Sequence, residues 1–258
     1  MQAQPMEVNL LEESTYPRIL NAGDSCIVIE FGSTISLEIN GQVQNLCRSL
    51  KDKNIRGIKE LIPTYRSLAI YFDPLEIPLD KLKETLTALS ETSIEKSAPG
   101  GKLLVIPVCY GGELGPDIEN VAKHNNLTVE EVIEIHTRPD YYCYMLGFTP
   151  GFSYLGGMDE RITTPRLETP RTLIPAGSVG IAGKQTGIYP IDSPGGWQLI
   201  GRTPLKMFDP ASENPTLIEA GCWVRFKPIS FEEYQAISSE VAKGTYPPEI
   251  LEKEGDAQ

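Results

Sequence analysis

The feature that most constrains the fold is the concentration of glycine and proline between Gly147 and Gly201. Eleven of the 23 glycines lie in this stretch, among short apolar runs and repeated prolines. Both residues disfavour helix interiors, whereas the tight turns that join short strands require them. We therefore expect the second half of the chain to be β-rich, built as a barrel or a sandwich.

The first hundred residues alternate between strand and helix patterns. Strands are predicted where short β-rich runs stop at Gly, Pro or Asp, and helices where apolar side chains recur at helical spacing. The order of these patterns, β-β-α-β-β-α, predicts a small α+β sandwich with a sheet on one side and helices on the other. The strand patterns cover residues 26–31, 57–62 and 67–72, and the helix patterns lie around 43–50 and 79–89.

A polar stretch, Ser93 to Lys102, separates this region from the rest and contains Pro99-Gly100-Gly101. Such a composition is typical of a linker. It predicts an N-terminal α+β domain of residues 1–98 and a second domain of residues 99–258. The second domain is expected to begin with a strand and two short helices, at 103–108, 117–124 and 129–136, the last with a capping box of Thr128 and Glu131.

The charge balance limits the partners of the chain. It has 23 basic and 35 acidic residues, a net charge of −12, and no basic run. Such a chain repels phosphate backbones and anionic lipids. Residues 1–11 lack the pattern of a secretory signal, and no apolar stretch reaches the length of a membrane span. We expect a cytoplasmic protein that binds neither nucleic acid nor membrane, with a frayed acidic tail after Gly244.

The cysteines and histidines do not form a metal-binding pattern. The five cysteines are widely spaced, no C-x-x-C pair occurs, and the two histidines are His124 and His136. No metal site is expected, and the cysteines are expected to be reduced and to serve as small apolar side chains. His124 follows a lysine in a polar stretch and is expected at the surface.

The first segment with candidate site residues runs from Gly147 to Gly157. Its glycines, Gly151 among them, let the backbone approach a ligand closely, and their N–H groups can hold an anion. The interleaved aromatic side chains Phe148 and Phe152 can form the wall of a pocket. A packed hairpin with aromatic core contacts explains the same pattern equally well.

The second segment, residues 175–190, superficially resembles a phosphate loop but lacks the G-x-x-x-x-G-K-[ST] motif. Its G-x-x-G spacing is therefore weak evidence for a nucleotide site. The side chains of Ser178, Gln185 and Thr186 offer neutral hydrogen bonds suited to an amide or a urea-like group.

The third segment, residues 193–204, has a turn that includes Gly196 and is followed by Trp197, Arg202 and Thr203. This order places an indole and a guanidinium on one short strand. Arg202 is suited to hold a planar carboxylate or phosphate with two hydrogen bonds. A surface arginine paired with one of the many carboxylates is the alternative interpretation.

His136 lies at the end of a predicted helix, on the side that faces the core. The negative end of the helix dipole favours the imidazolium form there. A general acid–base role fits a side chain that titrates near neutral pH. A structural histidine satisfied by backbone groups is the alternative.

Several ordered motifs resemble the family of 5-oxoprolinase B subunits, also described as the KipI family and as allophanate hydrolase subunit 1. The resemblance covers about residues 16–240. It is carried by Tyr110-Gly111-Gly112-Glu113, His136, Gly147-Phe148, Pro150-Gly151-Phe152, Pro175-Ala176-Gly177-Ser178-Val179, Gln185-Thr186-Gly187-Ile188-Tyr189-Pro190, Pro194-Gly195-Gly196-Trp197 and Gly201-Arg202-Thr203.

The resemblance implies an α+β N-terminal domain followed by a cyclophilin-like β-barrel domain. It implies a complex with two further 5-oxoprolinase components, the C (KipA-like) and A subunits. This complex opens 5-oxo-L-proline to L-glutamate and uses ATP, with Mg²⁺. The ATP site is expected to be shared with the partner subunits or supplied by them. The chain alone is expected to be inactive. In this interpretation Arg202 holds a carboxylate or phosphate and His136 assists proton transfer, while backbone donors come from Gly177, Ser178 and Gly180.

The same resemblance leaves two alternative functions. Some relatives are described as inhibitors of a sensor histidine kinase, which implies a protein-binding module without catalysis. The domain pair also resembles the central part of urea carboxylases, which implies a carboxyltransferase-type component that acts on a urea-like acceptor. This chain carries no Ala-Met-Lys-Met motif for biotin attachment, so carboxyl transfer would need a separate biotin carrier.

Overall fold

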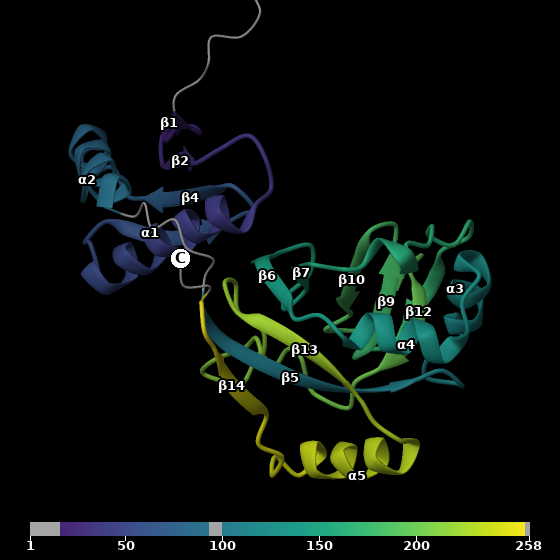
Figure 1. The fold of residues 1–258 in the computed structure, drawn as a ribbon. Coiled ribbons are helices and arrows are strands. Elements are labelled where there is room, and N and C mark those ends of the chain that lie inside the picture. Colours follow the sequence, from purple (N-terminus) through teal and green to yellow (C-terminus); the bar gives the residue numbers. More distant parts are fainter. Residues whose placement is uncertain (1–15, 93–99, 256–258) are drawn as a thin grey trace, which may run out of the picture.

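The computed structural model describes residues 16–92 and 100–255. Residues 16–92 form a small α+β unit and residues 100–255 a larger β-rich unit (Figure 1). The predicted boundary between residues 98 and 99 lies outside the described residues, as does most of the predicted linker. The end of that linker was assigned wrongly, because Gly101 and Lys102 begin the long strand β5 (Gly101–Tyr110).

The N-terminal unit is a four-stranded sheet with two helices. Its strands are antiparallel in the order β1-β2-β4-β3. The chain order β-β-α-β-β-α confirms the prediction made from the sequence. The elements are β1 (Arg18–Asn21), β2 (Cys26–Glu30), α1 (Leu37–Lys53), β3 (Ile58–Pro63), β4 (Ser67–Phe72) and α2 (Leu79–Thr92).

Helix α1 shows why these residues form these elements. The side chain of Ser36 accepts a hydrogen bond from the Ile39 N–H and so satisfies one free donor at the helix start. The helix ends where Asn54 takes a left-handed conformation, with φ 42°. Its apolar face is buried in the same hydrophobic cluster as strands β2 and β4, which gives this unit its own core.

The second unit is a nearly closed, barrel-like sheet. Most neighbouring strands are antiparallel, whereas β13 runs parallel to β5 over its full length. The α+β fold class with a barrel in the second half is thereby confirmed. The sheet order is β10 (Gln185–Ile188), β9 (Ser178–Ala182), β12 (Gln198–Arg202), β5, β13 (Trp223–Pro228), β6 (Tyr141–Leu146) and β7 (Ser153–Gly156), while β8 (Arg171–Ile174) and β11 (Ser193–Gly195) form a separate pair.

Helices α3 (Ile118–Asn125) and α4 (Val129–Thr137) pack their apolar residues into the barrel core. Both were predicted to within one residue at each end, and the capping box of Thr128 and Glu131 is present. A short 3₁₀ helix follows at Glu160–Ile162. All five cysteines are free and buried, as expected for small apolar side chains. His124 is exposed, as predicted.

The C-terminal segment differs from the prediction. Helix α5 (Phe231–Ala242) was not predicted, although Ser230 and Glu233 form a capping box at its start. The expectation of a frayed tail is wrong for β14 (Glu249–Lys253), which pairs with β5 (Figure 1). The Lys253 ammonium fixes the end of β14, because it binds the Asp140 carboxylate at 2.6 Å and lies 4.7 Å above the Trp223 ring.

Within residues 16–92 and 100–255, no helix is both long enough and apolar enough to cross a membrane.

Candidate functional site

A pocket of about 140 Å³ lies where the three turn-rich segments meet. Its walls are mainly aromatic, and Phe152 is at their centre. The Phe152 ring makes edge-to-face contacts with the rings of Tyr154, Tyr189 and Trp197, with centroids 5.4, 6.1 and 5.7 Å apart. The other residues that line the pocket are Phe148, Arg166, Gln185, Pro194, Gly195 and Gly196.

Two paired glycines place the Trp197 indole against the sheet. Gly180 in β9 and Gly187 in β10 are direct cross-strand partners. A Cβ atom at Gly187 would lie 3.3 Å from the indole ring, and one at Gly180 would lie 3.2 Å from the Trp197 Cβ. Because these two glycines have no side chain, the Trp197 indole can pack directly against the backbone of β9 and β10. The sequence pattern did not reveal this role.

The polar groups of the pocket are few. Arg166 is exposed at the rim, and the Gln185 amide lies in the wall. Burial raises the pKa of the Tyr189 phenol above its usual value, and the positive charges of Arg166 and Arg171 partly oppose this shift. The phenol is therefore neutral at physiological pH.

The N-terminal unit contacts the pocket wall through Tyr65. The Tyr65 phenol shares a hydrogen bond with the Gln185 side chain, and burial raises the pKa of this phenol. The Tyr65 ring packs against Tyr144 and Tyr154, with centroids 5.3 and 6.0 Å apart. The side chain of Gln185 is thus held between the two units.

The structure brings together five of the predicted site residues and separates the others. The five that line the pocket are Phe148, Phe152, Gln185, Gly196 and Trp197. The stretch from Gly147 to Thr203 therefore faces this pocket only in part. Arg202 lies away from the pocket because strand β12 separates it from Trp197. Trp197 directly precedes the first residue of β12, and Arg202 is its last residue.

Arg202 lies beside a turn of the preceding hairpin. Its Nε donates to the Ala176 carbonyl at 2.8 Å. The N–H of Gly177 donates to the Tyr189 carbonyl at 2.7 Å, and that of Ser178 donates to the Pro175 carbonyl at 3.2 Å. These N–H groups are used within the protein, so the structure does not support the expectation that they hold a substrate.

The remaining predicted residues take part in backbone hydrogen bonds and tight turns of the barrel unit. Thr203 is buried and its N–H donates to the Gly177 carbonyl at 2.9 Å. Gly177 has φ 82°, and a Cβ there would lie 2.5 Å from the Thr203 carbonyl oxygen. Gly151 has φ 80° in the turn before Phe152, where a side chain would meet Phe208 and Pro190.

His136 is fully buried behind the pocket wall. Its Nδ1 lies 2.8 Å from the Tyr110 hydroxyl and its Nε2 lies 2.8 Å from the Thr186 hydroxyl. The expectation that the helix end favours the imidazolium is wrong, because burial lowers the pKa of His136 to about 3. Burial in an apolar core outweighs the helix dipole, and the ring is neutral.

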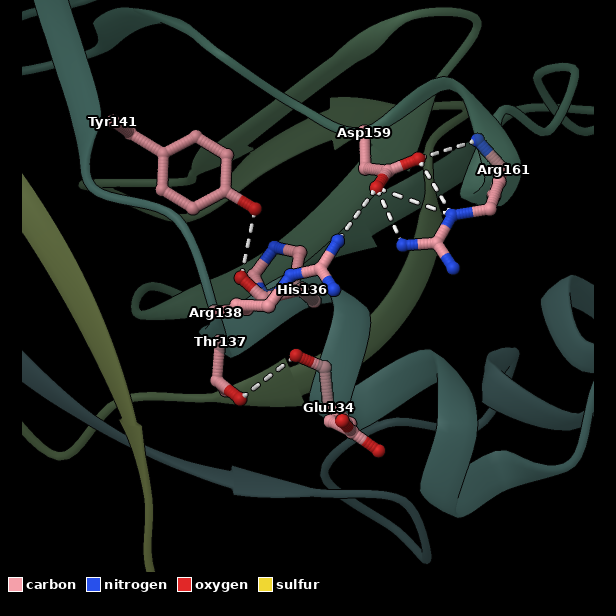
Figure 2. A network of polar contacts seen from close by, with 7 residues as sticks. All are labelled: Glu134, His136, Thr137, Arg138, Tyr141, Asp159 and Arg161. Atoms are coloured by element: carbon pink, nitrogen blue, oxygen red, sulfur yellow. Dashed lines mark hydrogen bonds and ion pairs between the residues drawn. The ribbon is translucent and has the colours of Figure 1, made fainter.

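The surroundings of the α4 end are shown in Figure 2. The Tyr141 hydroxyl donates to the His136 carbonyl at 2.7 Å. Further out, the Asp159 carboxylate lies between Arg138 and Arg161, at 3.2 and 2.7 Å. Hydrogen bonds from Arg161 lower the pKa of Asp159 to about 2. This ion-pair cluster fastens the turn after β7 to the helix end.

Sequence reasoning missed several residues that line the pocket or contact its wall. Tyr189 belongs to a quoted motif, yet the motif alone did not indicate that its ring forms a wall. Tyr154 lies two residues after Phe152, as strand alternation allows. Arg166 has no recognisable pattern around it, and Tyr65 comes from the other unit, so local sequence could indicate neither of them.

The fold and the pocket define the class of protein: an α+β unit joined to a barrel that carries an aromatic-lined pocket. Residues 17–218 match the family model described as the carboxyltransferase domain, subdomains C and D. The B subunit of the 5-oxoprolinase of Bacillus subtilis (strain 168) is 46% identical over 233 residues, 86% of this chain and 97% of the relative. That of Escherichia coli O157:H7 is 42% identical over 207 residues, 80% of this chain and 93% of the relative.

The chain belongs to this carboxyltransferase subdomain C and D family, among the B subunits of 5-oxoprolinases. A solved structure supports the fold. The protein TTHA0988 is 35% identical with a TM-score of 0.70, over 80% of this chain. This chain spans 40% of the length of TTHA0988.

Proposed function

We propose that this chain is the B subunit of a cytoplasmic, ATP-dependent 5-oxoprolinase that opens 5-oxo-L-proline to L-glutamate together with the C and A subunits of that enzyme. The observation that carries the proposal is the high identity to proteins named as 5-oxoprolinase B subunits, over nearly their whole length. The aromatic pocket supports it, because it offers a small site in which aromatic walls are combined with polar groups.

The chemistry requires activation of a stable five-membered lactam. In the proposed reaction ATP is the second substrate, its γ-phosphoryl group goes to the amide oxygen, and ADP leaves. Water then attacks the ring carbon, the C–N bond breaks to release the amine, and phosphate leaves as a second water completes the carboxylate. Walls that exclude water and hold the ring would protect the activated amide until the attack.

In residues 16–92 and 100–255, no group of three or more His, Cys, Asp or Glu side chains is placed to hold a metal ion. Phosphoryl transfer needs cations and metal around the phosphates. We propose that ATP and Mg²⁺ bind at a site that the partner proteins share or supply.

The proposal is tested by reconstitution. The chain is co-purified with the C and A subunits, and glutamate formation is measured with ATP and 5-oxo-L-proline. We expect activity only when all three proteins are present, and none from the chain alone. A stable complex that forms no glutamate, or full activity without this chain, would overturn the proposal.

Carboxyl transfer is a second candidate, because the matching family model carries that name. Such a reaction needs a biotinylated carrier from another protein. If it operates, bicarbonate incorporation into a urea-like acceptor will be blocked by avidin, whereas oxoprolinase activity will not. Inhibition of a histidine kinase remains a prediction from the sequence resemblance.

A further inference from the structure

We infer that the aromatic pocket of this chain recognises a small ring that carries a carboxylate, and that Arg166 binds the carboxylate. The particular ligand, 5-oxo-L-proline, rests on the proposed function. The class of ligand rests on the charge, size and lining of the pocket. The inference thus assigns to Arg166 the anion-binding role that sequence reasoning gave to Arg202.

The first observation is the charge of the lining. The chain has 35 acidic and 23 basic residues, yet of the described residues that line the pocket none is acidic and Arg166 is basic. The net charge of −12 repels anions from the protein as a whole. A positive charge at the pocket therefore favours an anionic ligand at this place.

The second observation is that the Arg166 guanidinium makes no ion pair within the described part of the chain, whereas three other arginines of the barrel unit are paired with carboxylates. Arg161, Arg171 and Arg225 bind carboxylates at 2.7 to 2.8 Å. An unpaired guanidinium at a pocket rim presents a planar set of donors that matches a carboxylate.

The third observation concerns size and wall chemistry. A dry cavity of about 150 Å³ holds a single benzene ring. The pocket, at about 140 Å³, therefore has room for one small ring and not for a nucleotide. Its edge-to-face cluster around Phe152 presents flat apolar surfaces to such a ring.

The fourth observation is the amide of Gln185 in the wall. It shares one hydrogen bond with the Tyr65 phenol and keeps further donor and acceptor capacity for a ligand. This capacity matches the N–H and C=O of a lactam. Arg202 cannot take the place of Arg166 in this pocket, because it does not line it and its Nε is bound to the Ala176 carbonyl.

The test measures binding to the isolated chain by calorimetry with three compounds. They are 5-oxo-L-proline, 2-pyrrolidinone, which lacks the carboxylate, and L-proline, which lacks the ring carbonyl. We expect 5-oxo-L-proline to bind at least about 10-fold more tightly than 2-pyrrolidinone, since a charge-assisted pair typically contributes this much or more. L-Proline keeps the carboxylate, so it should bind more tightly than 2-pyrrolidinone but less tightly than 5-oxo-L-proline, because it offers no ring carbonyl to Gln185. Arg166→Gln should remove the preference for the carboxylate and leave the affinity for 2-pyrrolidinone unchanged.

Two arginine variants complete the design. Arg56→Gln, at an exposed site of the N-terminal unit, is the matched control and should bind like the wild type. Arg202→Gln tests the competing assignment. Equal binding of the three compounds, or loss of carboxylate preference in Arg202→Gln rather than Arg166→Gln, would overturn the inference.

The assembled complex separates this inference from the proposed function. In an active complex, Arg166→Gln should raise KM for 5-oxo-L-proline about 10-fold or more and change kcat little. An active complex with an unchanged KM contradicts the inference alone. An inactive complex whose isolated chain still binds ring carboxylates through Arg166 contradicts the proposed function alone.

Discussion

The Nε2 atom of His136 lies 2.8 Å from the Oγ1 atom of Thr186, the chain neighbour of Gln185 in the pocket wall. The Thr186 hydroxyl also donates to the Gly180 carbonyl at 3.1 Å. A hydroxyl has one proton, so Thr186 must accept from Nε2, which leaves Nδ1 to accept from the Tyr110 hydroxyl. The network fixes one neutral tautomer and ties α4 to β10 behind the pocket.

This arrangement predicts that acid destabilises the protein through His136. The pKa is about 3 in the folded protein against an ordinary value of 6.5, so the unfolded chain binds the proton more readily between these values. The free energy of unfolding should fall as the pH drops below about 6.5, by up to ~1.4 kcal/mol per pH unit from this group. Urea unfolding at pH 7, 6 and 5 measures the slope.

The variant His136→Gln should lose this part of the slope, while His124→Gln, at an exposed position, should keep it. The comparison uses the difference in slope, so a variant of lower overall stability is still informative. If His136→Gln and the wild type lose stability in parallel between pH 7 and 5, His136 is not the neutral, buried group described here.

A second prediction concerns the buried carboxylate of Asp117. One of its oxygens accepts from Arg171 at 2.8 Å and the other from the Leu199 N–H at 2.7 Å. Removing the guanidinium leaves a buried charge without its partner, so Arg171→Met should lower the free energy of unfolding by about 2–4 kcal/mol. Urea denaturation measures the loss.

The exposed pair of Lys184 and Glu160 is the matched control, since both side chains are more than two-thirds exposed. Lys184→Met should change stability by less than about 1 kcal/mol. Equal losses in Arg171→Met and Lys184→Met would show that the buried pair contributes no more than a surface pair.

The fold was largely predictable because its signals are local. The apolar face of α1 and the capping box of α4 each lie within a few residues of sequence. Strand β14 was not predictable, because nothing in Glu249–Lys253 indicates that Lys253 meets Asp140, more than a hundred positions earlier. Helix α5 begins with a local capping box of Ser230 and Glu233, so its start is predictable from the sequence.

The residues of the pocket were predictable only where they lie in the glycine-rich segments of the sequence. The glycine-rich turns indicated Phe152 and Trp197, which do line one pocket. The pairing of β9 with β12 decides that Arg202 lies at the far end, and such a register cannot be obtained from glycine spacing. For His136, the sequence indicated the helix end but not the degree of burial, and burial determines the charge.

A third prediction contrasts two glycine positions. A Cβ at Gly195 would collide with the Tyr189 hydroxyl and lie 2.8 Å from Ile174, so Gly195→Ala should destabilise the protein by about 1–3 kcal/mol and distort the pocket. Gly41 lies inside helix α1 with no atom within 4 Å of an added Cβ. Gly41→Ala should therefore stabilise by about 0.5–1 kcal/mol. Thermal unfolding of both variants checks the opposite signs.

The last prediction starts from Asn40, a fully buried polar residue of α1 that joins the two units. Its amide donates to the carbonyls of Thr64 and Tyr65 at 2.8 and 3.1 Å within the N-terminal unit. Its oxygen accepts from the Tyr142 hydroxyl, on strand β6 of the barrel, at 3.1 Å. One side chain therefore satisfies polar groups on both sides of the contact between the units.

Replacing Asn40 with Ala leaves those partners buried without hydrogen bonds, which should cost about 2–4 kcal/mol of stability. Because the loss falls on the contact between the units, limited proteolysis should also become faster in Asn40→Ala. Asn45→Ala, at a less buried position of the same helix, should change either readout little. If Asn40→Ala unfolds at the wild-type urea concentration and resists protease equally well, Asn40 does not hold the two units together.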